Sequence, residues 1–308
     1  MKVTNNFNLP EAFLRAVSND DYDKGKAEVT ASELALPPRV FALKRKFAEE
    51  LTVDASELLP ILIGKSVHNI LEKADKEAVV EERLFAEVSG WLLGGKFDNH
   101  TEFNGVLRDW KTTRVDALQA KIREGFAEWT AQMNAYRYLL RKAGRQVEKL
   151  QVVALMVDFS PVKKRFNSEY PAVPVQVFDL PVWSDGQIEA YITQKIEDFK
   201  DALTELPLCT DEERWTRGGE VAVMKEGRKK AVKLFDNDVE AKAWLADQND
   251  APYLHLEYRK KEYIRCGFYC PVSDFCEQWQ REQLIVTKED PITVSADEYK
   301  PQMDGAIS

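Results

Sequence analysis

Hydrophobic positions recur along the chain with two spacings, one typical of helices and one typical of strands. Residues 39–51, 58–78 and 185–206 place apolar side chains every three or four positions, which predicts amphipathic helices. Residues 115–144 predict two helices broken near Gly125. Residues 79–88, 147–159 and 173–180 are short apolar runs typical of strands, and the nearly continuous run at 147–159 indicates burial on both faces. This order predicts an α/β fold with a mixed central sheet flanked by helices.

Residues 91–113 form the stretch around which the rest of the chain is arranged. We interpret them as two strands joined by a polar turn at 99–105, with Asp98 at the end of the first strand. Asp109 and Lys111 are two positions apart on the second strand, so they share a face. Two carboxylates and an ammonium group are sufficient for metal-assisted hydrolysis. A solvated cross-strand ion pair is the alternative interpretation.

Two predicted helices carry further polar residues at helical spacing. Gly64 and His68 lie four apart on residues 58–78, and a glycine inside a helix indicates the close approach of another backbone. Gln132 and Tyr136 lie four apart on the second half of 115–144 and therefore stack on one helical face. A core histidine and an amphipathic helix with a polar edge are the alternatives. Glu82, on the strand 79–88, is a further candidate acid.

The pattern changes after Pro207. A charged segment precedes a hairpin around Glu226–Gly227, a short helix over 238–247, a strand over 253–260 and a helix over 273–282. The predicted organisation is an N-terminal arm (1–36), a core (37–206), a small α+β insert with a C-terminal cysteine segment (207–287) and a tail (288–308).

Composition narrows the class of protein. At 308 residues with 44% hydrophobic and 31% charged residues, the chain has an ordinary globular composition. Its net charge of −9 argues against non-specific coating of nucleic acid, but short basic runs could still grip a phosphate backbone. These runs are 44–46, 163–165, 228–230 and 259–261. No apolar run is long enough to cross a bilayer and no hydrophobic signal core is visible, so we expect a cytoplasmic protein without membrane contact.

The four cysteines form a second constellation. Cys266, Cys270 and Cys276 lie within eleven residues, and Cys209 lies far from them in sequence. In a reducing compartment such a group indicates metal or redox chemistry rather than disulfides. Four thiolates suit a four-iron cluster or a tetrahedral zinc ion, although the paired C-x₂-C spacing of zinc sites is absent. Four unrelated buried thiols are the remaining alternative.

Taken in order, the motifs G-x-x-x-H, Asp, D-x-K and Q-x-x-x-Y, followed by the cysteines, resemble the PD-(D/E)XK nuclease superfamily. Within it the chain is similar to RecB-type exonucleases and to CRISPR-adaptation nucleases with an iron–sulfur cluster, and above all to phage-encoded members. The resemblance covers about residues 37–282 and implies a restriction-endonuclease-like core.

The resemblance implies a role for each motif residue. His68, Asp98, Asp109 and the carbonyl of Trp110 would bind the catalytic cation, Mg²⁺ or Mn²⁺, and Lys111 would position the attacking water or stabilise the phosphate. Gln132 and Tyr136 would steady the site and the nucleic acid. The chain has Phe97 where the motif has proline and Asp109 where glutamate is commoner, but any carboxylate can bind the cation.

The resemblance also implies that Cys209, Cys266, Cys270 and Cys276 hold a 4Fe-4S cluster, with zinc as the alternative. In the similar nucleases the distant cysteine precedes the core and the trio begins C-x₂-C, whereas here Cys209 follows the core and the first gap is three residues. We expect such a cluster to attach the C-terminal segment to the core.

Three functions remain open. The first is a metal-dependent DNA exonuclease that acts in recombination, repair or phage DNA processing in a bacterial or phage-infected cytoplasm, with a recombinase or helicase as its candidate partner. The second is a catalytically inactive nucleic-acid-binding or scaffold protein of the same fold. The third is a redox or regulatory protein with a metal held by the cysteines, in which Asp98 and Asp109 are structural.

Overall fold

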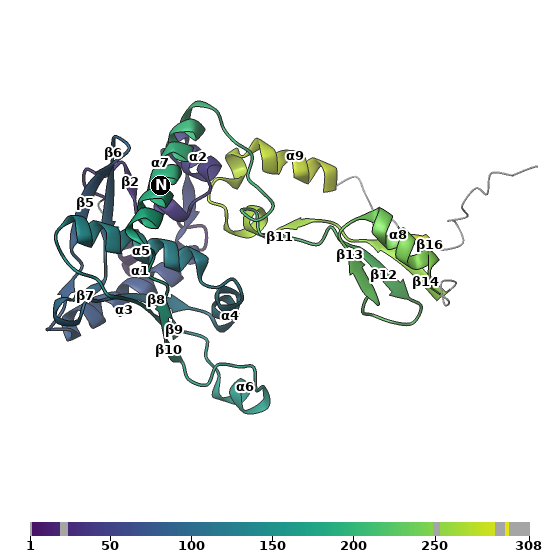
Figure 1. Ribbon diagram of the computed structural model, residues 1–308, viewed down its shortest axis with the longest axis horizontal. Coiled ribbons are helices and arrows are strands. Elements are labelled where there is room, and N and C mark those ends of the chain that lie inside the picture. The colour runs from purple at the N-terminus through teal and green to yellow at the C-terminus, as the bar shows by residue number, and fades with distance from the viewer. Residues whose placement is uncertain (1, 19–23, 249–252, 287–292, 296–308) are drawn as a thin grey trace, which may run out of the picture. The chain divides into compact units, whose positions relative to one another are not determined.

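A computed structural model describes residues 2–18, 24–248, 253–286 and 293–295 (Figure 1). The chain divides into two compact units, Met1–Pro207 and Leu208–Ser308, which we call the first and second units. The predicted limits of the arm (1–36), the core (37–206), the insert with the cysteine segment (207–287) and the tail (288–308) remain predictions. Of the predicted tail, 288–308, all but 293–295 lies outside the described residues.

The described helices of the first unit include the longest ones. Those of eight or more residues are α1 (Glu11–Ser18), α2 (Pro38–Lys46), α3 (Leu59–Ala74), α4 (Val115–Arg123), α5 (Ala127–Lys142) and α7 (Asp185–Thr204), and α6 (Pro161–Phe166) is shorter. Pro38 and Pro60 stand in the first turns of α2 and α3, where proline removes no helical hydrogen bond. Ser184 and Gln187 form a capping box at the start of α7. Three 3-10 turns (Glu33–Ala35, Ala55–Leu58 and Glu102–Asn104) separate other elements.

The strands of the first unit form a mixed sheet and two smaller ones. The five-stranded sheet has the order β10 (Val175–Leu180), β9 (Lys149–Met156), β8 (Val106–Thr113), β7 (Asn99–Thr101), β4 (Val79–Val80). In it β8 and β9 are parallel and the other pairs antiparallel. A three-stranded sheet joins β2 (Val29–Thr30), β6 (Trp91–Lys96) and β5 (Arg83–Val88), and β1 (Lys2–Thr4) pairs with β3 (Thr52–Asp54). The predicted α/β fold with a mixed sheet is confirmed.

The predicted hairpin between residues 91–98 and 106–113 is wrong. Strand β6 pairs with β5, and the two are joined by Ser89 and Gly90, which have φ of 49° and 72°. Two consecutive left-handed residues make the two-residue turn that suits hairpin twist, so the hairpin closes there. The segment expected to be a turn contains β7, which pairs with β8.

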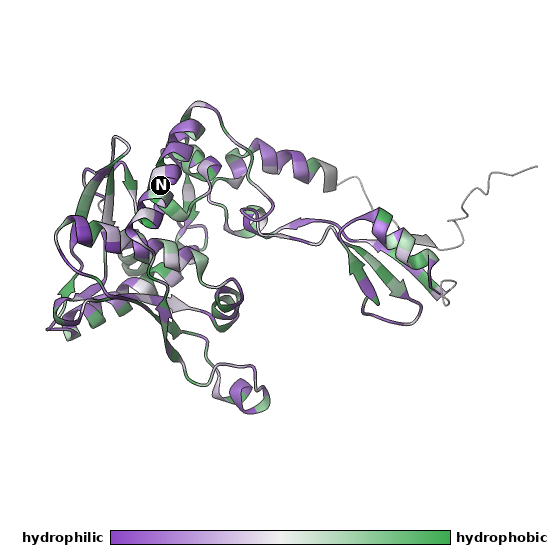
Figure 2. Ribbon diagram, viewed as in Figure 1, coloured by the Kyte–Doolittle hydropathy of each residue, from purple (hydrophilic) through white to green (hydrophobic). Residues whose placement is uncertain are grey.

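The main core of the first unit lies between the sheets and helices α2, α5 and α7. Phe41, Phe97, Leu139, Leu150 and Phe199 are at most 1% exposed and belong to one hydrophobic cluster. Phe41 stacks on Phe199 with 4.0 Å between ring centroids. Figure 2 shows hydrophobic colour along strands such as β5 and β12. The burial on β9 agrees with its central place in the sheet.

The second unit has a sheet of its own. Its order is β13 (Lys233–Phe235), β12 (Val221–Lys225), β14 (Leu254–Tyr258), β16 (Thr293–Ser295), all antiparallel, with α8 (Asp238–Ala246) packed against it. A separate pair joins β11 (Thr216–Arg217) and β15 (Glu262–Tyr263). A π-helical turn (Arg265–Tyr269), a 3-10 turn (Ser273–Phe275) and α9 (Glu277–Val286) carry or border the cysteine trio.

Among the described residues, no helix is long and apolar enough to span a membrane.

Candidate active site

Helix α3 brings His68 to the middle of strand β8. A Cβ on Gly64 would lie 3.3 Å from Oγ1 of Thr112, so α3 packs closely on a β8 side chain rather than on its backbone. One helical turn later, Nε2 of His68 lies 2.8 Å from the carbonyl oxygen of Trp110. The imidazole and the carbonyl that were expected to bind a cation are therefore neighbours.

Asp98 lies in the bend between β6 and β7 and faces the same point. Its Oδ2 accepts a hydrogen bond of 2.8 Å from the backbone N–H of Trp110, and its Oδ1 lies 3.5 Å from Nδ1 of His68. The side chain is 12% exposed. The backbone of β8 therefore fixes the orientation of the Asp98 carboxylate.

Glu81 is a third acidic neighbour that the sequence analysis missed. It lies between β4 and β5 with φ of 53°, and its N–H donates to the carbonyl oxygen of Asp98 at 3.2 Å. Its Oε1 lies 4.0 Å from Nδ1 of His68, and its Oε2 pairs with Lys96. His68, Glu81 and Asp98 each offer a ligand atom, and these three atoms lie within 4.8 Å of one another. The adjacent pair Glu81–Glu82 was the available signal, but the left-handed backbone at 81 breaks the alternation of the strand.

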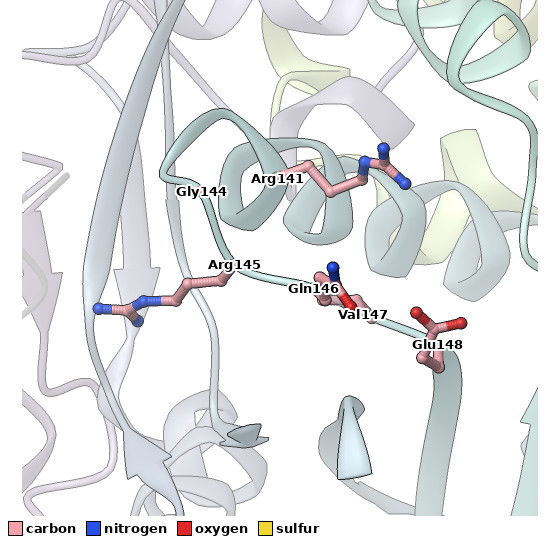
Figure 3. A pocket seen from close by; sticks show the side chains of 6 residues that line it. All are labelled: Arg141, Gly144, Arg145, Gln146, Val147 and Glu148. Atoms are coloured by element: carbon pink, nitrogen blue, oxygen red, sulfur yellow. The ribbon is translucent and has the colours of Figure 1, made fainter. Parts of the chain in front are cut away.

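Glu82 has a different environment. Both of its carboxylate oxygens accept hydrogen bonds from the guanidinium of Arg145, at 2.5 and 3.1 Å. Arg145 belongs to a pocket lined by Arg141, Gly144, Arg145, Gln146, Val147 and Glu148, which Figure 3 shows after the end of α5. None of the residues expected to be catalytic lines this pocket.

A chain of side chains leads from Asp109 to helix α5. Asp109 is 2% exposed, and its Oδ2 lies 2.8 Å from Nζ of Lys111, as their shared strand face predicts. Nζ of Lys111 donates to Oε1 of Gln132 at 3.1 Å, and Nε2 of Gln132 donates to the hydroxyl of Tyr136 at 2.9 Å. The structure thus brings the predicted Asp109, Lys111, Gln132 and Tyr136 together, with Lys111 held from two sides.

The electrostatics of the site favour an added positive charge. Burial, followed by the nearby Asp109 carboxylate, raises the pKa of Asp98 to about 8. Burial lowers the pKa of Lys111, but the charge of Asp109 and its hydrogen bond outweigh this effect and leave that pKa above its ordinary value. Lys111 is thus an ammonium group at neutral pH, while Asp98 holds a proton that a bound cation would displace.

The donor set fits a hard divalent cation. Two carboxylates and an imidazole are ligands that Mg²⁺ or Mn²⁺ accepts, and histidine shifts the preference toward Mn²⁺. His68, Glu81 and Asp98 would hold the ion, with the Trp110 carbonyl beside them. Asp109 was also expected to be a ligand. Asp109 lies outside this group of three, but its negative charge is close enough to raise the pKa of Asp98.

The cysteines lie together in the second unit, all as free thiols. Gln278 holds Cys209 by two hydrogen bonds of 2.9 Å, one from the Cys209 N–H and one to its carbonyl oxygen. Since Gln278 is two residues after Cys276, this pair brings the distant cysteine to the trio. Burial, then Glu213 and the other three thiols, raises the pKa of Cys209 to about 12, so the metal-free thiol is protonated.

Arg214 adds a buried cation beside these thiols. It is 5% exposed, its Nη1 lies 3.2 Å from Glu282, and its guanidinium lies 3.3 Å from the centroid of the Tyr263 ring. Burial lowers the pKa of Arg214, but hydrogen bonding with Cys266 and Glu282 outweighs this and raises it. Among the described residues, Nε and Nη2 have no hydrogen-bond partner of standard geometry. A buried cation with spare donors suits an anionic group at the cysteines.

The sequence profile of the PD-(D/E)XK nuclease superfamily matches residues 39–277 of the chain. That range includes the predicted site residues from His68 to Tyr136 and all four cysteines. Among curated proteins, none matches the chain significantly.

Several solved structures are similar to the chain, including the following three crystal structures. That of SSO0001 shares 18% identity with a TM-score of 0.46, covering 66% of this chain and 88% of its own. That of a phage related exonuclease from Haemophilus somnus 129PT shares 13% with a TM-score of 0.38, covering 59% and 96%. That of LHK-Exo in complex with dAMP shares 15% with a TM-score of 0.31, covering 58% and 90%.

Proposed function

Because the chain belongs to the PD-(D/E)XK nuclease superfamily, we propose that it is a metal-dependent DNA exonuclease acting in recombination, repair or phage DNA processing. The observation that carries the proposal is the meeting of two short networks on strand β8. One is the His68, Glu81 and Asp98 donor group, and the other is the Asp109, Lys111 and Gln132 chain. Metal ligands beside a fixed ammonium group are the arrangement that phosphodiester hydrolysis requires.

Each network has a separate task in the proposed reaction. A divalent cation held by the donor group would supply a water of lowered pKa and neutralise charge on the phosphate. Asp98 would release its proton to solvent on binding such a cation, since the carboxylate is the ligand form. The water would lose a proton to solvent as its oxygen bonds to phosphorus, the bond from phosphorus to the leaving oxygen would break, and that oxygen would take up a proton from solvent.

Lys111 contributes the second charge in this reaction. Its ammonium donates to a non-bridging phosphate oxygen, where negative charge increases in the transition state. Gln132 holds Nζ in place through its Oε1, and Tyr136 in turn holds the amide of Gln132. Because these contacts already exist without substrate, little reorganisation is needed when the phosphate arrives.

We also propose that the four cysteines hold a 4Fe-4S cluster. Sulfur atoms around a tetrahedral zinc lie about 3.8 Å apart, as follows from Zn–S bonds of about 2.3 Å. Within the described residues, His68, Glu81 and Asp98 are the one group of three donors within 4.8 Å, and the cysteine sulfurs form no such group. A 4Fe-4S cluster binds one thiolate at each iron and would therefore use all four cysteines. Four free thiols also fit a reducing cytoplasm.

End-labelled single-stranded and duplex DNA, incubated with Mg²⁺ or Mn²⁺, tests the catalytic proposal. We expect hydrolysis from the ends, its loss in EDTA, and its loss in Asp109→Ala and Lys111→Ala proteins that still bind DNA. Binding without hydrolysis by the wild type would instead favour an inactive nucleic-acid-binding protein of the same fold. DNA digestion by the alanine variants at the wild-type rate would refute the assignment of the site.

A further inference from the structure

The segment between strands β9 and β10 carries helix α6 (Pro161–Phe166) on an exposed tip. All nine residues from 161 to 169 are exposed, and they include Val162, 67% exposed, and Phe166, 82% exposed. These two apolar side chains are four apart and therefore share one face of the helix. Between them lie Lys163, Lys164 and Arg165.

The base of this segment is firmly braced. The rings of Phe159 and Tyr170 pack with 5.5 Å between centroids, and the Tyr170 hydroxyl accepts a hydrogen bond of 2.9 Å from the Ser160 N–H. The Ser160 hydroxyl caps α6 at the N–H of Lys163, and Gln119 of α4 donates to the carbonyl of Glu169 at 3.0 Å. Phe159 and Tyr170 also pack against the cluster of Val115, Leu118, Ala154 and Met156. Two aromatic rings anchor the segment, while the third, Phe166, is held out in solvent.

Comparison with the other basic runs singles out α6. In run 44–46, Arg45 lies over Phe41 and Trp91, and in run 259–261, Lys261 pairs with Asp211. Lys163, Lys164 and Arg165 form no ion pair with any described residue. Run 228–230 also lacks ion pairs among the described residues but has no aromatic neighbour in its turn. Free cations beside an exposed aromatic ring, in a chain of net charge −9, are the combination found on platforms that bind single strands.

The position of α6 relative to the active site fits this use. Strands β8 and β9 are parallel, with Lys111 paired to Ala154. Pro161 follows Ala154 by seven positions, so α6 begins at most about 25 Å from the level of Lys111.

We propose that α6 is a binding platform for single-stranded DNA, on which a base stacks on Phe166 while Lys163, Lys164 and Arg165 contact phosphates. This inference rests on the proposed nuclease function and adds the strand form of the substrate. A base in a single strand has an open face for the ring, whereas bases inside a duplex are already stacked.

Fluorescence anisotropy of the full chain in EDTA tests the proposal, because binding is then measured without hydrolysis. The probes are a labelled twenty-nucleotide oligothymidine and a blunt duplex of the same length. We expect Phe166→Ala to weaken binding of the single strand by about 5-fold or more, the lower end of the effect of one stacked base. Binding of the duplex should change less than that. The matched control is Phe103→Ala, since Phe103 is 78% exposed at the opposite end of β8.

The salt dependence of binding tests the role of the three basic residues of α6. Replacing Lys163, Lys164 and Arg165 together by alanine should reduce the slope of log affinity against log salt by about 2, since each lost phosphate contact accounts for about 0.7 in single strands. The same triple change at 228–230 should leave the slope as it is. Circular dichroism melting of each variant checks that its fold is intact.

Three results would overturn the platform. The first is that Phe166→Ala binds the single strand within twofold of wild type. The second is that Phe166→Ala loses as much affinity for the duplex as for the single strand. The third is that the variants keep their DNA binding but lose binding to phosphatidylserine vesicles, measured in parallel, which would make α6 a membrane contact. If the wild type binds neither DNA probe, the proposed function itself fails, which is a different outcome.

Discussion

Asp98→Asn should change how the metal-free protein responds to pH. Asparagine keeps the size of the side chain and an oxygen that can accept from the Trp110 N–H, but it cannot ionise. In the wild type, burial and then Asp109 raise the pKa of Asp98 to about 8, whereas an unfolded aspartate titrates near its ordinary value of 3.8. The folded state therefore holds one more proton between these values, and stability falls as pH rises through this window.

The size of the effect follows from this difference. One pKa unit corresponds to about 1.4 kcal/mol, so between about pH 6 and pH 8 the wild type should lose about 2 kcal/mol of unfolding free energy through Asp98 alone. Asp98→Asn should lack this loss. His68 and Lys111 are present in both proteins, so the difference between the two curves isolates Asp98.

Urea denaturation in EDTA, followed by circular dichroism at both pH values, provides the measurement. Excess Mg²⁺ or Mn²⁺ should restore stability to the wild type at the higher pH and leave Asp98→Asn unchanged, because the cation binds the ionised carboxylate. If the two proteins lose equal stability between the two pH values, Asp98 is not the buried acid described above, and the electrostatic reasoning fails.

Three further predictions concern the other parts of the two sites. Glu81→Gln should weaken Mn²⁺ binding by at least about 10-fold in calorimetric titration, whereas Glu82→Gln, at the acid bound by Arg145, should leave it unchanged; equal effects would refute the distinction between them. Lys111→Met should lower kcat by about 10²- to 10³-fold with little change in DNA affinity, as for removal of one transition-state donor, and a change in affinity alone would argue against this role. Arg214→Met should reduce the iron content and the absorbance near 400 nm of anaerobically purified protein, and equimolar zinc without iron in the wild type would rule out the cluster.

Local spacing made much of the site predictable from the sequence. Asp109 and Lys111 share a strand face, and Gln132 and Tyr136 share a helical face, so each pair meets wherever the element packs. Glu81 was missed because its left-handed backbone interrupts the two-residue period on which the strand interpretation rested.

Longer-range features were harder to predict. The pairing of β6 with β5 depends on the two-residue turn at Ser89–Gly90. This turn is short and lies between two apolar segments, so the hydrophobic pattern alone did not indicate it. The bridge from Gln278 to Cys209 joins positions 69 residues apart, and no local pattern encodes such a contact. Sequence periodicity thus specified which face a residue occupies, but not which partner strand or segment it meets.

The hairpin that closes at Ser89–Gly90 has a consequence for how the chain can vary. Glu81 and Asp98 are hydrogen-bonded across its two arms, about equally far from the tip. Lengthening both arms by the same number of residues would leave these two acids opposite each other. A single residue inserted into one arm would shift the register and turn one acid to the opposite face. Paired length changes at the tip are therefore a route by which relatives could diverge, or an engineer could add a module, while the metal ligands stay in place.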